Sequence, residues 1–252
     1  VERFYSFLTK KFIIPQLQSA GKGLDINKPW NIDIYGSKIS LGNNVHIRTS
    51  KNTITQLCAW NRNDCDGEIY IGNNVLISPG VKILSSKKIV IESNVMIASN
   101  VYISDSDWHE VYDRISTPGL SSEVYISENA WLGEGSKIAK GVKIGKNSII
   151  GMGSIVVSDV PDNSIFGGNP AKKIGEIDTN KPMRTREDLF LNKDYKNLMK
   201  FLIKEDLKDN SILKWLRTIF YRKKGDWFLI LLPNLLRFPH YALHYLEMVL
   251  EF

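Results

Sequence analysis

The chain has 252 residues, of which 43% are hydrophobic and 24% are charged, and this is the composition of a globular protein. Only 2 residues are cysteines, too few for a disulfide scaffold, and no apolar run approaches the roughly 20 residues that span a bilayer. The net charge of +6 is mildly basic; it is compatible with acidic partners, and we expect no nucleic-acid partner.

The N-terminal segment is predicted to be a helical cap. Residues 1–23 alternate apolar and basic positions, a pattern typical of a short amphipathic helix. We therefore assign residues 1–31 to this cap. Because the first residues lack the layout of a secretory signal, we expect a cytoplasmic protein.

A repeat of six residues dominates the segment 32–177. Five consecutive hexads begin at Ile126, two pairs begin at Ile71 and Ile91, and a single copy begins at Leu41. In the five consecutive hexads an aliphatic residue is followed by a small one, and Ala, Ser or Val stands four positions after the opening. These hexads are in phase with one another.

A period of six fits short strands joined by tight corners, three strands to a coil, with one aliphatic side chain per strand pointing inward. Gly and Asn at the corners tolerate the positive φ that such turns need. An ordinary sandwich of short strands would instead show irregular spacing of about 8–12 residues. The pattern therefore predicts an all-β core formed by a parallel β-helix, although periodicity does not fix its handedness.

The hexads resemble the left-handed β-helix of the hexapeptide-repeat acyltransferases. Residues 153–174, which include the turn Gly-Asn-Pro-Ala, are similar to the exit from the helix in that family. The resemblance covers about residues 32–177 and is closest to the galactoside, maltose and polysaccharide O-acetyltransferases. It implies a left-handed coil, acetyl-CoA as co-substrate without a metal, and a homotrimer.

Two segments, 48–68 and 104–123, interrupt the repeat, and we expect the chemistry in the second, the predicted catalytic loop. His109 lies there, and catalytic groups are common on loops held by a rigid scaffold. Transfer to a hydroxyl needs a base with a pKa near neutrality, which imidazole supplies. Galactoside-type enzymes, by the resemblance, place their catalytic histidine a similar distance after the Asn that corresponds to Asn100. We therefore predict His109 as the general base.

The neighbours of His109 leave alternatives open. One of Asp105 and Asp107 could orient the imidazole or bind sugar hydroxyls, or both could be solvated loop acids. Trp108 could stack on a sugar ring or pack the loop onto the coil. Together with Asn100 they form the predicted acceptor site.

The remaining candidates for chemistry are weaker. His46 is expected at the surface, and we expect His240 and His244 to pack in a helix rather than bind a metal, because no third ligand is evident. Cys58 and Cys65 have no adjacent histidine, so we expect no covalent intermediate.

The resemblance also implies where coenzyme A binds, in a groove between neighbouring subunits of the trimer. Small residues allow the pantetheine arm to approach the backbone, and a lysine suits the nucleotide phosphates. Gly133 and Gly151, which the resemblance assigns to this groove, would also be explained by turn geometry alone. Many relatives carry a basic residue where this chain has Ser158, which moves the expected phosphate contact to Lys172 or Lys173. The predicted residues are Trp131, Gly133, Glu134, Gly151, Met152 and Lys172.

Residues 178–252 are predicted to form an α-helical extension, with helices at about 186–208 and 211–224. The segment 212–224 contains five basic residues and no acidic one, and its apolar residues recur at helical spacing. Three interpretations remain: a helical subdomain packed on the coil or another subunit, a peripheral contact with the inner membrane, or a patch that guides an acidic polysaccharide.

These observations together predict an acetyl-CoA-dependent O-acetyltransferase acting on a sugar hydroxyl of a bacterial capsular polysaccharide, a lipopolysaccharide or its precursor. One alternative is the same chemistry on the amine of an amino-sugar or xenobiotic. Another is a β-helix without catalysis that serves as a binding or assembly module, against which the presence of His109 in a long loop argues.

Overall fold

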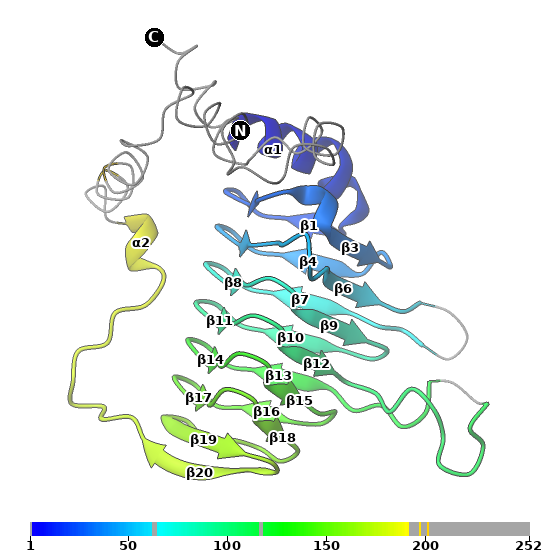
Figure 1. Ribbon diagram of the computed structural model, residues 1–252, viewed down its shortest axis with the longest axis vertical. Coiled ribbons are helices and arrows are strands. Elements are labelled where there is room, and N and C mark those ends of the chain that lie inside the picture. The colour runs from blue at the N-terminus through cyan, green and yellow to red at the C-terminus, as the bar shows by residue number, and fades with distance from the viewer. Residues whose placement is uncertain (1, 62–64, 116–117, 192–196, 198–200, 202–252) are drawn as a thin grey trace, which may run out of the picture. The chain divides into compact units, whose positions relative to one another are not determined.

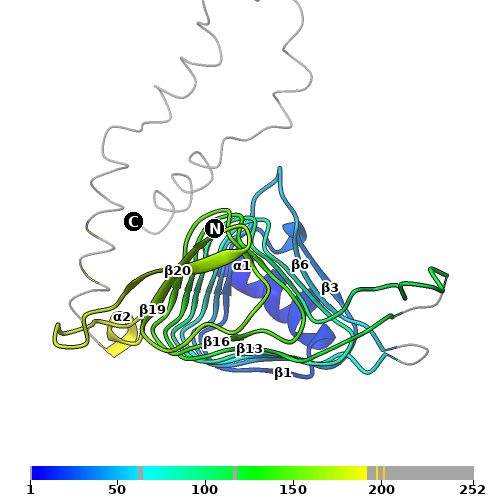
Figure 2. The same ribbon diagram turned by 90° about the horizontal axis from the view of Figure 1, so that it is seen from below.

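The computed structural model describes residues 2–61, 65–115, 118–191, 197 and 201, and the account below concerns the compact unit Glu2–Leu191. The chain winds into a triangular coil of short parallel strands (Figures 1 and 2). Three parallel sheets, called A, B and C here, form its sides. The predicted helices around 211–224, with His240 and His244, lie outside the described residues.

Each turn of the coil contributes one strand to each sheet. Sheet A contains β1 (Ser19–Ala20), β4 (Ile39–Leu41), β7 (Ile69–Ile71), β10 (Ile89–Ile91), β13 (Val124–Ile126) and β16 (Lys143–Ile144). Sheet B contains β2 (Asp25–Ile26), β5 (His46–Ile47), β8 (Leu76–Ile77), β11 (Met96–Ile97), β14 (Trp131–Leu132), β17 (Ile149–Ile150), β19 (Ser164–Gly168) and β20 (Ala171–Glu176). Sheet C contains β3 (Ile32–Tyr35), β6 (Thr55–Ala59), β9 (Lys82–Ser85), β12 (Tyr102–Ser104), β15 (Lys137–Ile138) and β18 (Ile155–Val156). All pairings are parallel except that of β19 with β20, which is antiparallel and closes the coil.

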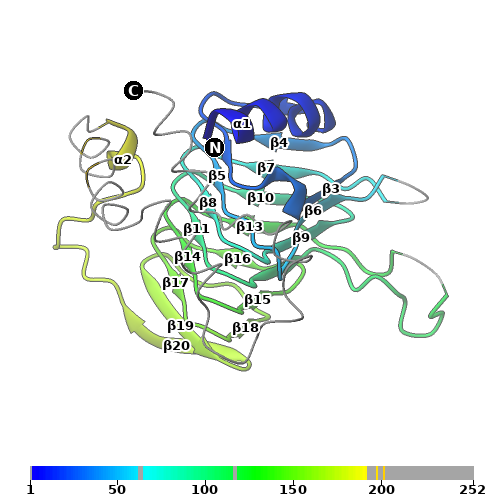
Figure 3. The ribbon, with the colours of Figure 1, turned by 45° about the horizontal axis from the view of Figure 1, so that its top comes forward.

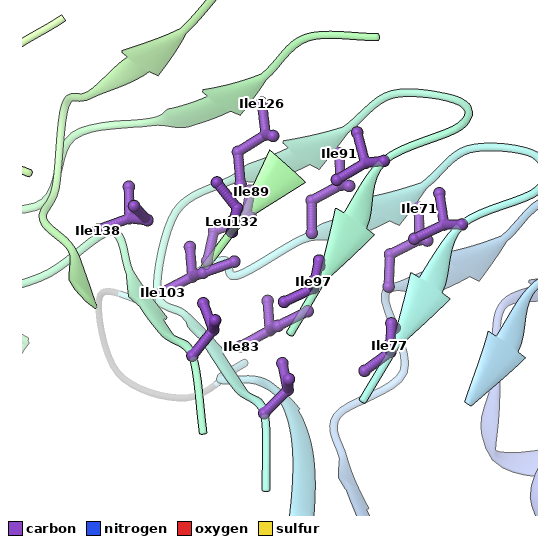
Figure 4. Close-up of a cluster of buried hydrophobic side chains, with 14 of the residues drawn as sticks. Ile71, Ile77, Ile83, Ile89, Ile91, Ile97, Ile103, Ile126, Leu132 and Ile138 are labelled. Carbon is purple, nitrogen blue, oxygen red and sulfur yellow. The ribbon is translucent and has the colours of Figure 1, made fainter. Parts of the chain in front are cut away.

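The first residue of each hexad points into the coil, as its aliphatic character predicts. In sheet A, for example, Ile71 pairs with Ile91 and Ile91 with Ile126, and all three side chains are fully buried. Sheets B and C repeat this arrangement, so the interior consists of stacked aliphatic columns (Figure 4). Close packing of these columns, worth about 1.5–3 kcal/mol for each buried side chain, stabilises the coil.

The corner between sheets A and B is built from asparagine. At this corner six asparagines have φ between 54° and 65°, the left-handed region that Asn tolerates better than most residues. Their side-chain amides form hydrogen bonds from one coil to the next, such as Asn129 Nδ2 to Asn147 Oδ1 at 3.0 Å and Asn147 Nδ2 to Asn163 Oδ1 at 2.8 Å. We call this the asparagine corner; its residues are Asn44, Asn74, Asn94, Asn129, Asn147 and Asn163.

Helical segments cap the N-terminal end of the coil, as predicted. Helix α1 (Glu2–Leu8) continues through a π-helical turn (Thr9–Ile13) and a 3-10 turn (Ile14–Gln16) across the top of the sheets (Figure 3). A further 3-10 turn (Pro29–Asn31) leads into β3. Ile13 is buried in the core and Phe12 is exposed, so this segment is amphipathic.

After β20 the chain runs back along the asparagine corner, and we call residues 177–191 the strap. Arg186 Nε donates a hydrogen bond to the carbonyl of Asn74 at 2.7 Å, and the Phe190 ring lies 5.2 Å from the His46 ring in an edge-on contact. The strap ends in the short helix α2 (Asp188–Leu191). His46, expected at the surface, is therefore half-buried beneath Phe190.

Candidate active site

Both interruptions of the repeat emerge at the same corner, between sheets C and A. The first, residues 60–68, joins β6 to β7, and the second, residues 105–123, joins β12 to β13. A tight turn at residues 86–88 joins β9 to β10 between them. Figure 2 shows the two loops projecting from one edge of the triangle. The break predicted over 48–68 is shorter than expected, since β6 occupies part of it with an inward Leu57.

Asp105 lies at the root of the second loop and is fully buried. Its carboxylate accepts hydrogen bonds from the backbone N–H groups of Ser86 and Lys87, at 2.8 and 3.0 Å, and from Ser85 Oγ at 2.7 Å. The carboxylate therefore faces the turn of the preceding coil. It does not face solvent, where a sugar would bind, and its hydrogen bonds go to residues 85–87, so it does not contact the His109 imidazole directly, as one hypothesis proposed.

The next residues hold the two limbs of this loop together. Ser106 and Ser121 form an antiparallel bridge, and Asp107 N donates to Leu120 O at 3.1 Å. Beyond the bridge, Gly119 has φ +74°, and a Cβ there would lie 2.6 Å from the carbonyl oxygen of His109. The limbs thus approach as closely as glycine permits.

Trp108 packs the loop onto the coil, which is one of the two roles that the sequence left open. Its indole Nε1 donates to Ser104 Oγ at 3.1 Å, and its ring meets the Trp60 ring edge-on at 5.8 Å. Tyr35 continues this row, with its ring 4.8 Å from that of Trp60. Trp108 has φ +67°, a conformation that these contacts stabilise.

His109 is exposed on the loop beyond Trp108. Asp107, two residues before His109, forms an ion pair with Lys140, which lies at the corner between β15 of sheet C and β16 of sheet A. The structure therefore places His109 where a second molecule can reach it, with a carboxylate nearby in sequence that is already paired with a lysine.

A pocket of about 650 Å³ opens between the two loops, with the turn at 86–88 as part of its wall. Its lining combines carboxylates, two lysines, serine hydroxyls and loop backbone, which suits a polyhydroxylated ligand. None of these residues was predicted from the sequence, although seven of them lie within the two interruptions of the repeat. They are Asp66, Glu68, Ser86, Lys87, Lys88, Glu110, Pro118, Gly119, Ser121 and Glu123.

The predicted coenzyme A residues lie on sheet B and at the corner that follows it. Trp131 is 46% exposed and stands in an outward row between Met96 and Ile149. Gly133 and Gly151 occupy successive coils of that corner. A Cβ on Gly133 would lie 2.5 Å from the carbonyl oxygen of Ile150, so turn geometry alone requires glycine there.

The other exposed members of this set are Glu134, Met152 and, on β20, Lys172. Asn100 also lies at the corner between sheets B and C, with φ +60°. That corner is at the far end of sheet C from the loop that carries His109. Since Asp105 is five residues after Asn100 and β12 runs between them, the distance between the corners is roughly 15 Å. One chain therefore does not bring Asn100 or the cofactor residues together with His109.

Cys58 is not arranged as a nucleophile. Burial, with a contribution from Asp33, raises the pKa of the Cys58 thiol to about 11. Across the residues that the structure describes, no group of three or more His, Cys, Asp or Glu side chains could hold a metal ion. None of the described helices is long and apolar enough to cross a membrane.

Comparisons with known proteins agree with this fold. The family model of the bacterial transferase hexapeptide (six repeats) matches residues 123–158. The chain is similar to a mutant of AntD, an N-acyltransferase from Bacillus cereus in complex with dTDP-4-amino-4,6-dideoxyglucose and coenzyme A, at 22% identity and a TM-score of 0.56, over 69% of this chain and 90% of that one. This likeness shows the fold, and the predicted left-handed parallel β-helix of hexapeptide repeats is confirmed.

Two further structures are less similar in shape. A maltose O-acetyltransferase from Clostridium difficile 630 has 27% identity and a TM-score of 0.46, over 70% of this chain and 86% of that one. A galactoside acetyltransferase in complex with coenzyme A has 25% identity and a TM-score of 0.45, over 69% and 70%. No curated protein matches the sequence.

Proposed function

Since this chain is a hexapeptide-repeat protein built on the left-handed parallel β-helix, we propose that it is an acetyl-CoA-dependent acetyltransferase acting on a sugar hydroxyl. The observation that carries this proposal is the loop 105–123. It is fastened to a rigid coil at its root, presents an exposed His109, and borders a polar pocket. We propose a capsular polysaccharide, a lipopolysaccharide or its precursor as the acceptor.

In the proposed reaction His109 acts as general base. The imidazole takes the proton of the acceptor hydroxyl while the hydroxyl oxygen attacks the thioester carbonyl carbon. The C–S bond then breaks, and the imidazolium returns the proton to the leaving sulfur, which gives an acetyl ester and a free thiol. A backbone N–H near the edge of the coil would stabilise the oxyanion.

A homotrimer would complete the site. The loop of His109 starts at one end of sheet C, whereas the predicted cofactor residues lie on sheet B and at the other end of sheet C, so we expect a neighbouring coil to supply one of the two groups. The outward row of sheet B is apolar over Leu76, Met96, Trp131, Ile149 and Ile165, whereas that of sheet C includes Lys82 and Lys137. We propose that the sheet B row faces the neighbour and the pantetheine arm. Light scattering tests this, and a fully active monomer would contradict it.

One observation favours an amine as the second candidate acceptor. The pocket contains four carboxylates and two lysines. Asp66 pairs with Lys38, and Glu68 lies 3.6 Å from Lys88, but Glu110 and Glu123 add negative charge that an ammonium group would neutralise. The same loop and base would then form an amide on an amino-sugar.

The test is acetyl transfer by the full-length protein. Thioester consumption is measured with acetyl-CoA and a panel of capsular and lipopolysaccharide oligosaccharides, each with its matched amino-sugar analogue. Mass spectrometry identifies the acetylated product. We expect transfer to hydroxyls; transfer to amines alone would favour the second candidate. Binding of oligosaccharide without thioester consumption would instead favour a non-catalytic binding module.

A further inference from the structure

Asp105 is a buried carboxylate whose role the proposed reaction does not explain. It is 0% exposed, and its hydrogen-bond donors are two backbone N–H groups and two hydroxyls of residues 85–87. Among the described residues no cation forms an ion pair with it. Burial of a charged group is costly unless hydrogen bonds compensate for it, and these four bonds provide that compensation for a buried carboxylate.

The turn that Asp105 holds is connected to the loop of His109 by hydroxyl groups. Ser86 Oγ lies 2.7 Å from Ser121 Oγ, across the root of the loop. Ser121 Oγ in turn donates to Ser106 Oγ at 3.1 Å. Asp105 therefore fixes the backbone of Ser86, and Ser86 contacts the returning limb of the loop.

The last link reaches the residue next to His109. Ser106 Oγ accepts the backbone N–H of Trp108 at 3.0 Å and donates to the carbonyl of Pro118 at 2.7 Å. Both limbs of the loop thus form hydrogen bonds with the hydroxyl of Ser106. One bond comes from Trp108, immediately before His109, and the other goes to Pro118, beside Gly119. The chain of contacts is continuous from Asp105 to the backbone of His109's neighbours.

We propose that Asp105 is a positioning residue, which sets the place of the His109 imidazole through residues 86, 121 and 106. This inference rests on the proposed function. A misplacement of about 1 Å at a reacting group can reduce turnover about 100-fold, and His109 itself is exposed, so the loop root must supply its position. Asp105 touches neither acceptor nor coenzyme A in this proposal.

The test compares Asp105→Asn with the matched variant Asp159→Asn. Asp159 lies at the same corner of the coil and also accepts a backbone N–H of the preceding coil, that of Lys143 at 2.8 Å, but it is exposed and remote from the loop. In Asp105→Asn the new amide N–H group faces another N–H donor, of Ser86 or Lys87.

The variants are assayed at a temperature below the Tm of each. For Asp105→Asn we expect kcat to fall about 10–100-fold, with the KM for acetyl-CoA within about twofold of that of the unmodified protein. Hydrogen exchange in residues 106–122 should become faster. Asp159→Asn should retain kcat and the slow exchange of the loop. An unchanged kcat for folded Asp105→Asn, or loop exchange equal to that of the unmodified protein, would overturn the proposal.

Ser106→Ala removes the last link without unpairing a buried charge, and it keeps the proposal testable if Asp105→Asn does not fold. We expect a loss of kcat and faster loop exchange in this variant too. The double variant, Asp105→Asn with Ser106→Ala, should lose less activity than the product of the two single losses, because both substitutions act along one path. Unchanged kcat and loop exchange in Ser106→Ala would contradict this path. Absence of acetyl transfer by the unmodified protein would reject the proposed function, while loop exchange would still decide the role of Asp105.

Discussion

Two corners of the same coil follow opposite rules. At the asparagine corner, between sheets A and B, successive coils place the same residue at nearly the same φ and connect the side chains by amide hydrogen bonds. At the corner between sheets C and A, the connections differ in length from coil to coil: the short turn at 86–88 lies between the loop 60–68 and a loop of 19 residues numbered 105–123. Regular corners stabilise the stack, and the irregular corner forms the pocket of about 650 Å³ and presents His109.

The comparison shows why a coil of this kind can carry a site without losing stability. Every inward side chain of the repeats on either side of the loops remains in its column, for example Ile103 before the second loop and Val124 after it, both fully buried. An insertion at a corner leaves the strands in register, since β12 still pairs with β9 and β15. The cost of the loop is limited to its closure entropy, which grows slowly with length.

The largest expected effect comes from the irregular corner. His109→Ala should reduce kcat by about 10²–10⁴-fold, the usual contribution of a positioned general base, and leave acetyl-CoA binding nearly unchanged. Steady-state kinetics with isothermal titration of acetyl-CoA would measure both. Turnover within a few-fold of the unmodified enzyme would show that another group is the base, and a simultaneous loss of acetyl-CoA binding would indicate a structural role.

The sequence alone predicts the regular parts of the molecule well. Hexads such as the one at Ile126 repeat one local solution, so the aliphatic columns and the corners at positive φ follow from short-range rules. The irregular corner depends on contacts between residues far apart in the chain. Nothing in the sequence near Asp105 indicates that it binds residues 86 and 87, one coil earlier, or that residues 66–68 and 118–123 line one pocket.

The strap and β6 were also beyond sequence reasoning. The strap has no periodic pattern, and its contacts with Asn74 and His46 join segments more than 100 residues apart. The hexad pattern is weak in β6, where Thr55 and Ala59 occupy buried positions beside Leu57, so this strand was included in a predicted interruption.

The next effect concerns the stability of the asparagine corner. Asn147→Ala places alanine at φ 59°, which costs about 1–2 kcal/mol, and removes two amide hydrogen bonds worth about 1 kcal/mol each. We expect the free energy of unfolding to fall by about 3 kcal/mol, measured by urea denaturation, with kcat unchanged.

Asn147→Gly separates the two contributions. Glycine accepts positive φ without strain but cannot make the amide bonds, so it should recover part of the loss. If alanine and glycine variants were both as stable as the unmodified protein, the amide ladder would contribute nothing to the corner.

A smaller effect is expected from truncation, which separates the strap from the C-terminal extension. A chain ending at Leu191 should retain the trimer, acetyl-CoA binding and the Tm, and should lose activity on a polymeric acceptor more than on a short fragment. A chain ending at Ile177 also lacks the contacts of Arg186 and Phe190, and its Tm should fall by a few degrees.

Controls distinguish the three interpretations of the extension. Equal losses on polymer and fragment would reject a guiding role for residues 192–252. Absence of sedimentation of the full chain with anionic liposomes at low salt would reject contact with the membrane. If both roles are rejected, packing on the coil or on another subunit remains as the proposal.

The smallest effect is a pH dependence of stability at the end of the asparagine corner. Burial, and then the charge of Arg48, lower the pKa of His46 to about 4, and Arg186 of the strap acts in the same direction against Asp25. The imidazole thus stays neutral in the folded protein between pH 6.5 and about 4, where the unfolded chain binds a proton. Its contribution is complete above pH 6.5 and is lost progressively as the pH falls towards 4. The urea midpoint should therefore decrease as the pH is lowered over this range, and less steeply in His46→Gln.

The chain ending at Ile177 lacks Phe190 and Arg186, so its His46 should titrate at higher pH and its midpoint should also depend less on pH. Equal slopes in the full chain and in the chain ending at Ile177 would show that the strap leaves the His46 environment unchanged. An equal slope in His46→Gln would show that His46 does not cause the pH dependence.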